Sequence, residues 1–136
     1  MNNILVIYPN DILSYHFIKN KLIEHQIIYI LIRVEKNITS LDIFNSFLNE
    51  YGIFEYDTEN CILLEGDCMN TDILLEKTYN FENYFDEIYY FEENHSFLIE
   101  NRYQIVNYYN IINITNFIKK KSEMTKFKYV KYLNQN

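Results

Sequence analysis

The sequence predicts a single α/β domain over residues 1–136, built as a three-layer sandwich around a mainly parallel sheet. Five short apolar runs rich in Ile, Leu, Tyr and Phe are typical of buried strands. Between them lie segments whose apolar residues recur at helical spacing. Strands that alternate with helices indicate βαβ units. A chain of 136 residues is also long enough to bury one core of its own.

The first predicted unit is a strand followed by a helix. Residues 3–8, NILVIY, form an apolar run that is ended by Pro9, Asn10 and Asp11. We expect a helix over residues 12–25, with Asn10 or Asp11 as its N-cap. The side chains expected on its core face are Ile12, Leu13, His16, Phe17, Leu22 and Ile23. On that face His16 is expected to be a core residue and not a metal ligand.

The second unit repeats this order. Residues 27–33, IIYILIR, form another buried strand. A helix over residues 40–51 follows, capped by Thr39 or Ser40, and Gly52 stands where a C-terminal glycine is favoured. The side chains expected on its core face are Leu41, Phe44, Phe47 and Leu48.

The rest of the chain adds three strands. Residues 61–65, 86–91 and 127–133 have the composition of strands. Residues 70–85 are expected to form short helix and loop, and residues 96–121 a long helical stretch that could break near Arg102. Right-handed crossovers then favour a doubly wound, Rossmann-like sheet with the strand order 3-2-1-4-5.

Charge and composition exclude several functions. The formal net charge is −7, with 18 Asp and Glu but only six Lys and Arg in residues 1–118. An acidic body repels phosphate backbones, so we expect no nucleic-acid partner. Lys119, Lys120 and Lys121 stand where cations favour the end of a helix; a binding patch is the alternative. No apolar run approaches the roughly 20 residues of a membrane span, and the first residues do not resemble a signal peptide.

The cysteine and histidine spacings point to no metal site. Cys61 and Cys68 are about 23 Å apart if the segment between them is a strand, at ~3.3 Å per residue, so we expect both thiols to be free. Free thiols suit a cytoplasmic protein. No zinc-binding spacing is present. A cation held by Asp67, Glu92 and Glu93 is conceivable, but solvated acids are the favoured interpretation.

Five segments in order resemble the first half of the extended short-chain dehydrogenase/reductase family, above all its thioester reductase and fatty acyl-CoA reductase branch. Ile7–His16 aligns with the family pattern T-G-A-T-G-F-L-G-S-H. Ile30–Arg33 aligns with C-L-V-R, and Leu64–Asp67 with V-x-G-D. Asn107–Ile114 aligns with N-V-x-G-T-x-N-I, and Phe127–Val130 with F-x-Y-V. The resemblance implies a Rossmann-like domain that, in the family, binds a nicotinamide dinucleotide.

The departures from the family pattern argue against that cofactor. Tyr8, Asp11 and Ser14 replace the three glycines that let the backbone approach a pyrophosphate. The small residues after the fourth strand are replaced by Glu92 and Glu93, among others. The catalytic Ser or Thr and the Tyr-x-x-x-Lys pair of the family have no counterpart in the 136 residues. We therefore expect no cofactor and no catalysis.

Three residues match positions that have roles in the family. The resemblance implies that Arg33 could contact an adenosine 2′-phosphate, that Asp67 could lie near the adenine, and that Asn107 could support the active site. The alternative is that they are inherited scaffold, with Arg33 paired to a nearby acid, Asp67 capping a turn and Asn107 serving its helix. This scaffold interpretation is favoured, so Arg33 and Asp67 remain weak cofactor-binding candidates.

The sequence is best explained by a non-catalytic interaction or scaffold domain with a protein partner or a second copy of itself. Lys128 and Lys131 interrupt the fifth strand, as charges do on a sheet edge. Tyr108 and Tyr109 are candidates for an interface or for core packing. A nucleotide- or small-ligand-binding sensor that uses Arg33 and Asp67 is the main alternative. An enzyme of a new kind at the acidic sheet edge is a third, without a positive feature to support it.

Overall fold

The computed structural model describes residues 3–33, 37–68, 85–91, 100–121 and 126–130. Their elements follow in chain order: β1 (Ile4–Ile7), α1 (Ile12–Ile23), β2 (Ile28–Ile32), α2 (Ser40–Tyr51), the 3-10 turn η1 (Thr58–Asn60), β3 (Cys61–Glu65), β4 (Glu87–Phe91), α4 (Glu100–Lys121) and β5 (Lys126–Val130).

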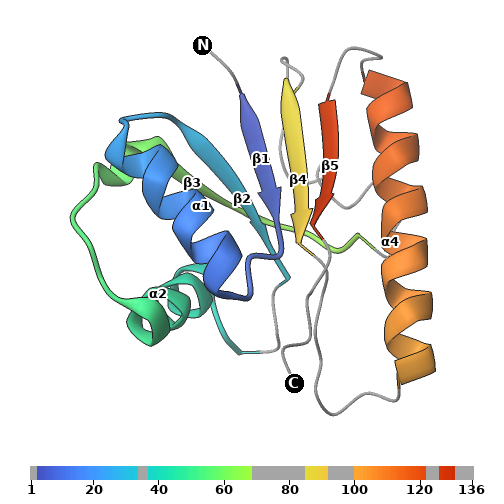
Figure 1. Ribbon diagram of the computed structural model, residues 1–136, viewed down its shortest axis with the longest axis horizontal. Helices are drawn as coiled ribbons and strands as arrows, with labels where there is room; N and C mark the ends of the chain where they lie inside the picture. The colour runs from blue at the N-terminus through green and yellow to red at the C-terminus, as the bar shows by residue number, and fades with distance from the viewer. Residues whose placement is uncertain (1–2, 34–36, 69–84, 92–99, 122–125, 131–136) are drawn as a thin grey trace.

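The described strands form one sheet in the order β3-β2-β1-β4-β5. Every neighbouring pair in it is parallel. Helices α1 and α2 lie on one side of the sheet and α4 lies on the other, which gives three layers (Figure 1). The predicted Rossmann-like fold and strand order are therefore confirmed. The carboxyl ends of all five strands meet at one edge of the sheet.

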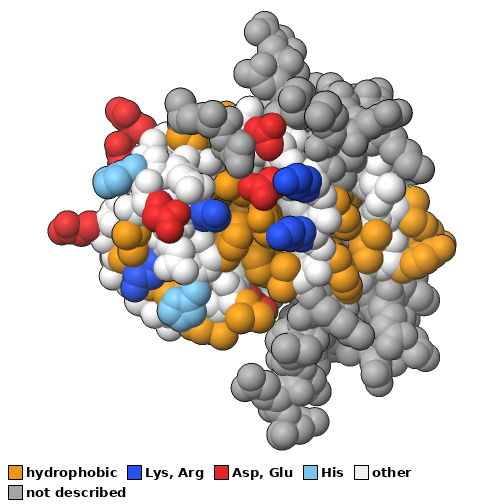
Figure 2. Space-filling model, turned by 45° about the horizontal axis from the view of Figure 1, so that its top comes forward, with side chains coloured by type: hydrophobic (Ala, Val, Ile, Leu, Met, Phe, Trp, Pro, Cys, Tyr) orange, Lys and Arg blue, Asp and Glu red, His pale blue; other side chains and the backbone are white. Residues whose placement is uncertain are grey.

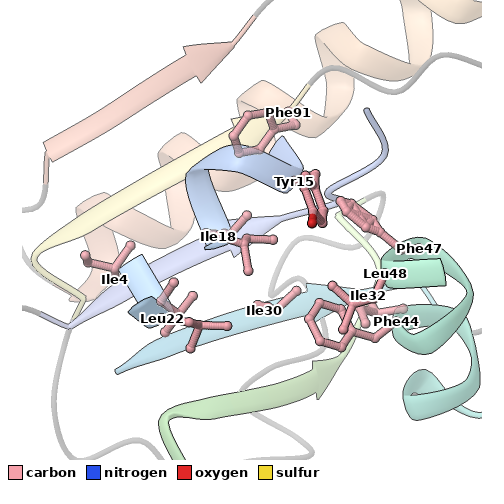
Figure 3. Close-up of a cluster of buried hydrophobic side chains, with 12 residues drawn as sticks. Ile4, Tyr15, Ile18, Leu22, Ile30, Ile32, Phe44, Phe47, Leu48 and Phe91 are labelled. Atoms are coloured by element: carbon pink, nitrogen blue, oxygen red, sulfur yellow. The ribbon is translucent and has the colours of Figure 1, made fainter. Parts of the chain in front are cut away.

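Two hydrophobic cores fill the space between the layers. The core on the α1 and α2 side joins aliphatic strand residues to aromatic side chains of the helices, as Figure 3 shows for Tyr15, Phe44 and Phe47. The core on the α4 side contains Leu5, Tyr90 and other residues that alternate with the first set along the strands. The central strand β1 is buried on both faces, as its unbroken apolar sequence requires.

Helix α1 presents a different face to the core than its sequence suggests. Its buried residues are Ser14, Tyr15, Ile18 and Leu22. The prediction was wrong for Ile12, Leu13, His16 and Ile23, which are exposed. The reason is Tyr15, whose ring packs against α2 and whose hydroxyl donates to the Gly52 carbonyl oxygen. In α2 the prediction held for Phe44, Phe47 and Leu48 but not for Leu41, which is exposed.

The long helix α4 is continuous from Glu100 to Lys121, so the break expected near Arg102 is absent. It contains neither Gly nor Pro, the residues that most readily interrupt a helix. Residues 69–84, most of the segment expected to form short helix and loop, lie outside the described residues, as do residues 96–99 and 131–133.

The start of α1 is fixed by a capping box between Asp11 and Ser14. The Asp11 carboxylate accepts a hydrogen bond from the Ser14 backbone N–H at 2.8 Å. The Ser14 hydroxyl oxygen accepts one from the Asp11 backbone N–H at 3.0 Å. Such a box satisfies N–H groups that the helix itself leaves without partners.

Replacing Asp11 with Ala is expected to lower the free energy of unfolding by about 1 kcal/mol, because an Ala at the N-cap cannot accept the Ser14 hydrogen bond. Urea denaturation followed by circular dichroism measures this change. The exposed Ser46→Ala variant within α2 serves as control and should not be destabilised. Equal stability of the two variants would contradict the role given to the capping box.

Candidate functional site

The candidate site lies at the carboxyl edge of the sheet, beside the point where the strand order reverses. In doubly wound sheets ligands bind in the crevice at this edge. Here β1 is flanked by β2 and β4, and Tyr8 follows β1 directly. Arg33 follows β2, and Asp67 and Cys68 lie just beyond β3. The fold therefore brings together residues that the sequence analysis singled out separately.

Tyr8 occupies the centre of this edge. Its backbone has φ of 58°, a conformation that favours glycine, and it stands at the first glycine position of the aligned loop. Its side chain is nonetheless 6% exposed. The hydroxyl accepts a hydrogen bond from the Cys68 backbone N–H at 2.8 Å. Tyr8 thus combines a backbone conformation that favours glycine with a buried aromatic ring.

Two further side chains enclose the Tyr8 ring. The Arg33 guanidinium carbon lies 4.8 Å from the ring centre, within the range of a cation–π contact. The Tyr90 ring meets it edge-on, with 6.3 Å between centres. Arg33 also lies 3.9 Å from an Asp67 carboxylate oxygen, and the two side chains are 32% and 37% exposed. The expected pairing of Arg33 with a nearby acid is confirmed.

The N-terminus of α1 has few of the features that bind an anion. A phosphate at a helix N-terminus needs free backbone N–H groups and no competing negative charge. Here the Asp11 carboxylate accepts from the Ser14 N–H. The Ser14 hydroxyl oxygen accepts from the N–H groups of Asn10 and Asp11, each at 3.0 Å. These residues do not fit the diphosphate of a dinucleotide in the usual pose.

A row of three buried asparagines on α4 supports the same edge from the other layer. Asn107, Asn110 and Asn113 recur at every third position and face the sheet. The Tyr90 hydroxyl donates to the Asn107 side-chain oxygen and accepts from the Asn110 side-chain nitrogen, the latter at 3.0 Å. The Asn113 side-chain nitrogen donates to the Cys68 carbonyl oxygen at 2.7 Å. These bonds fix α4 against β4 and the end of β3.

The sequence analysis singled out only Asn107 of this row. The signal that could have found the other two is the N-Y-Y-N-I-I-N spacing, which places three amides on one face of a helix beside Ile114. Buried amides require partners, and the partner Tyr90 lies 17 residues from Asn107, beyond what a local pattern can indicate.

Both cysteines are free, as expected. Cys68 is buried at the candidate site, with its backbone N–H bonded to Tyr8 and its carbonyl oxygen to Asn113. Burial raises the pKa of the Cys61 thiol to about 12. The thiolate is the reactive form, so the raised pKa disfavours reaction at Cys61, and burial shields Cys68.

Thiol titration of the folded protein at pH 8 should reflect this. We expect Cys61 and Cys68 to react with a disulfide reagent at least about a hundredfold more slowly than in the chain unfolded by urea, because one thiol has a raised pKa and the other is buried. The unfolded chain, in which two thiols should titrate, is the control. A fast phase in the folded protein would contradict the description of this edge.

The other predicted residues lie apart from this edge or outside the described residues. Tyr108 and Tyr109 are exposed on the outer side of α4, so the core-packing alternative for them was wrong. Lys128 is exposed on β5. Lys131, Glu92 and Glu93 lie outside the described residues, and with them the cation site that would use both glutamates.

The described residues contain neither a candidate metal site nor a candidate membrane-spanning helix. They contain no group of three or more His, Cys, Asp or Glu side chains that could hold a metal ion. Of the helices that the structure describes, none is both long and apolar enough to cross a membrane.

Comparison with solved structures supports the fold described above. The chain is similar to a thiolation-reductase di-domain of an archaeal non-ribosomal peptide synthetase, with a TM-score of 0.71 and 19% identity over 96% of this chain and 34% of that one. It is also similar to vestitone reductase from alfalfa (Medicago sativa), with a TM-score of 0.60 and 15% identity over 95% of this chain and 36% of that one.

The two structures define the class of fold to which the chain belongs. The chain spans about a third of the length of each, and its Rossmann-like fold is similar to part of both structures, as the sequence resemblance implied. No family model matches the sequence, and no curated protein matches it. The likeness therefore concerns the fold.

Proposed function

We propose that this chain is a non-catalytic relative of reductase domains that has lost its dinucleotide site and acts by binding another protein. The observation that carries the proposal is the position of Tyr8. At a turn with φ of 58°, its side chain is buried and is held by the Cys68 N–H and the Arg33 guanidinium. A cofactor in the usual pose would have to displace this ring.

The charge at the same place adds a second obstacle. A diphosphate at the N-terminus of α1 would lie against the Asp11 carboxylate, which caps that helix. Two like charges ~4 Å apart at a surface-like dielectric repel by about 4 kcal/mol, which corresponds to roughly a thousandfold in affinity. Burial of Tyr8 and the charge of Asp11 oppose the cofactor independently, so removing one obstacle leaves the other.

Titration calorimetry with NADPH and NADH tests the first half of the proposal. We expect dissociation constants weaker than about 1 mM for both. A dissociation constant below about 10 μM would overturn the proposal. It would favour the alternative function, a nucleotide or small-ligand sensor. The half-exposed Arg33 and Asp67 side chains are what supports that alternative, and ATP and acyl-CoA belong in the same titration series to test it.

Light scattering and co-purification from the native source test the second half. A domain that acts through protein contacts should self-associate, or should co-purify with one protein in a fixed ratio. A strict monomer from about 1 to 100 μM with no co-purifying protein would contradict an interaction role while leaving the blocked cofactor site untouched.

A further inference from the structure

The side of β4 and β5 that faces away from α4 forms an unusual surface. Side chains alternate along a strand, so Tyr89 and Phe91 of β4 point to the α1 side together with Lys126, Lys128 and Val130 of β5. Phe17 of α1 reaches this surface: its ring centre lies 4.4 Å from that of Tyr89 and 6.1 Å from that of Phe91. We call Phe17, Lys21, Tyr89, Lys126, Lys128 and Val130 the β4–β5 face.

This face lacks a helical layer in the part of the chain that the structure describes. Parallel sheets are found almost only with both faces covered. Helix α4 covers the opposite face of β4. On this side α1 and α2 pack mainly over β2 and β3, and α1 reaches β4 through Phe17. Lys126 and Lys128 are exposed, and Phe17, Tyr89 and Val130 are half-buried. Figure 2 shows hydrophobic side chains on this side of the molecule, with Lys or Arg side chains and some Asp or Glu side chains beside them.

The charges of the face indicate what would cover it. The Lys21 ammonium lies 5.6 Å from the Phe17 ring centre, and the Lys128 ammonium lies 5.8 Å from the Tyr89 ring centre. Two acids lie nearby, and each accepts a hydrogen bond from a neutral donor within the chain. The Asp86 carboxylate accepts from the Asn3 N–H at 2.7 Å, and the Glu87 carboxylate accepts from the Tyr89 hydroxyl at 3.2 Å. Glu87 lies on the same face as Tyr89, opposite Lys126 in the strand register. Three lysines and this one carboxylate give the face an excess of positive charge beside its apolar stripe, in a chain of net charge −7.

We propose that the β4–β5 face binds an amphipathic helix of a partner protein, with its apolar stripe on Phe17, Tyr89 and Val130 and acidic residues beside the three lysines. Such a helix would complete the missing layer in the way α1 and α2 cover β2 and β3. A second copy of this chain is a poor occupant, because two lysine-bordered faces repel each other. The inference rests on the proposed function and names the surface through which it operates.

Fluorescence anisotropy with a labelled 18-residue amphipathic peptide tests this surface. The peptide carries a Leu stripe with Glu on both flanks, and a second peptide replaces every Glu with Lys. We expect the acidic peptide to bind the full chain with a dissociation constant of about 10–100 μM and the basic peptide at least about tenfold more weakly. The variants Lys128→Glu and Lys126→Glu should each weaken binding of the acidic peptide about tenfold.

A matched control separates the surface from net charge. The double variant Asn45→Glu/Asn49→Glu changes the net charge as much as Lys128→Glu does, but both positions are exposed on α2, so binding should change less than about twofold. Equal affinity for the two peptides, or unchanged affinity in Lys128→Glu, would overturn the inference. Self-association that Lys128→Glu abolishes would instead identify a second copy as the occupant and also overturn it.

The proposed function and the assignment of the β4–β5 face as the binding surface can be tested separately. Tight NADPH binding would overturn the proposed function whatever the peptides do. If neither NADPH nor the acidic peptide binds, the blocked cofactor site stands, and only the assignment of the interaction surface falls.

Discussion

Replacing Tyr90 with Phe is expected to lower the free energy of unfolding by about 2–4 kcal/mol. The Tyr90 hydroxyl is fully buried, donates to the Asn107 side-chain oxygen and accepts from the Asn110 side-chain nitrogen. Each buried amide that loses a partner costs about 1–3 kcal/mol. The ring itself remains, so its packing against Tyr8 and its stacking on Tyr129 are preserved. Urea denaturation at pH 7 measures the difference.

The control for this variant is Tyr108→Phe on the same helix, where the side chain is 62% exposed and loss of the hydroxyl should cost less than about 0.5 kcal/mol. A second variant, Tyr90→Phe with Asn110→Leu, should recover part of the loss, because replacing both members of a buried polar pair is milder than replacing one. A Tyr90→Phe protein as stable as Tyr108→Phe would show that the buried amides depend on other partners.

The asparagine row explains how α4 is held in one register. Among the side chains of α4 that the structure describes, Ile114 is the one large aliphatic group that is buried, alongside Asn107, Asn110 and Asn113. Apolar contacts are tolerant of small shifts, whereas hydrogen bonds to Tyr90 and to the Cys68 carbonyl are directional. The hydrogen bonds therefore specify the position of α4, which its apolar packing alone would leave less well defined.

The sequence predicted the elements of the fold well because their signals are local. Apolar runs and their turn residues located all five strands, and Asp11 and Thr39 are the N-caps that side-chain chemistry favours. The predicted core face of α1 was wrong because the helix has two apolar stripes. Which stripe faces the core depends on the hydrogen bond of Tyr15 with Gly52, 37 residues away.

The candidate site was predicted in part for the same reason. Tyr8, Arg33 and Asp67 were identified because each aligns with a position of the family pattern. The parallel sheet then brings these positions to one edge. What Tyr8 does there could not be predicted, because its hydroxyl is bonded to an N–H 60 residues further along the chain. Of the two lysines of β5, Lys128 was predicted as an edge charge and Lys126 was not. The aromatic pair beside them depends on Phe17 meeting Tyr89 across the layers, which no local pattern indicates.

Replacing Tyr8 is also expected to lower the free energy of unfolding strongly. The informative result is which of two variants, Tyr8→Ala or Tyr8→Gly, is the more stable. Replacing the buried ring with Ala removes its packing and the hydrogen bond to Cys68, which should cost about 3–5 kcal/mol. Gly is ordinarily worse than Ala by about 0.5–1 kcal/mol. At φ of 58° the order should reverse, since Ala loses about 1 kcal/mol or more in a left-handed backbone conformation.

We therefore expect Tyr8→Gly to be more stable than Tyr8→Ala by about 1 kcal/mol in urea denaturation. The same pair of substitutions at the exposed position Asn45 within α2, where the backbone is helical, should show the ordinary order, with Ala the more stable. If Ala were favoured at both positions, the turn after β1 would not hold the glycine conformation. If Gly is favoured at Tyr8 alone, the backbone there is held in a left-handed conformation, and the buried Tyr8 ring stabilises the fold by more than this conformation costs.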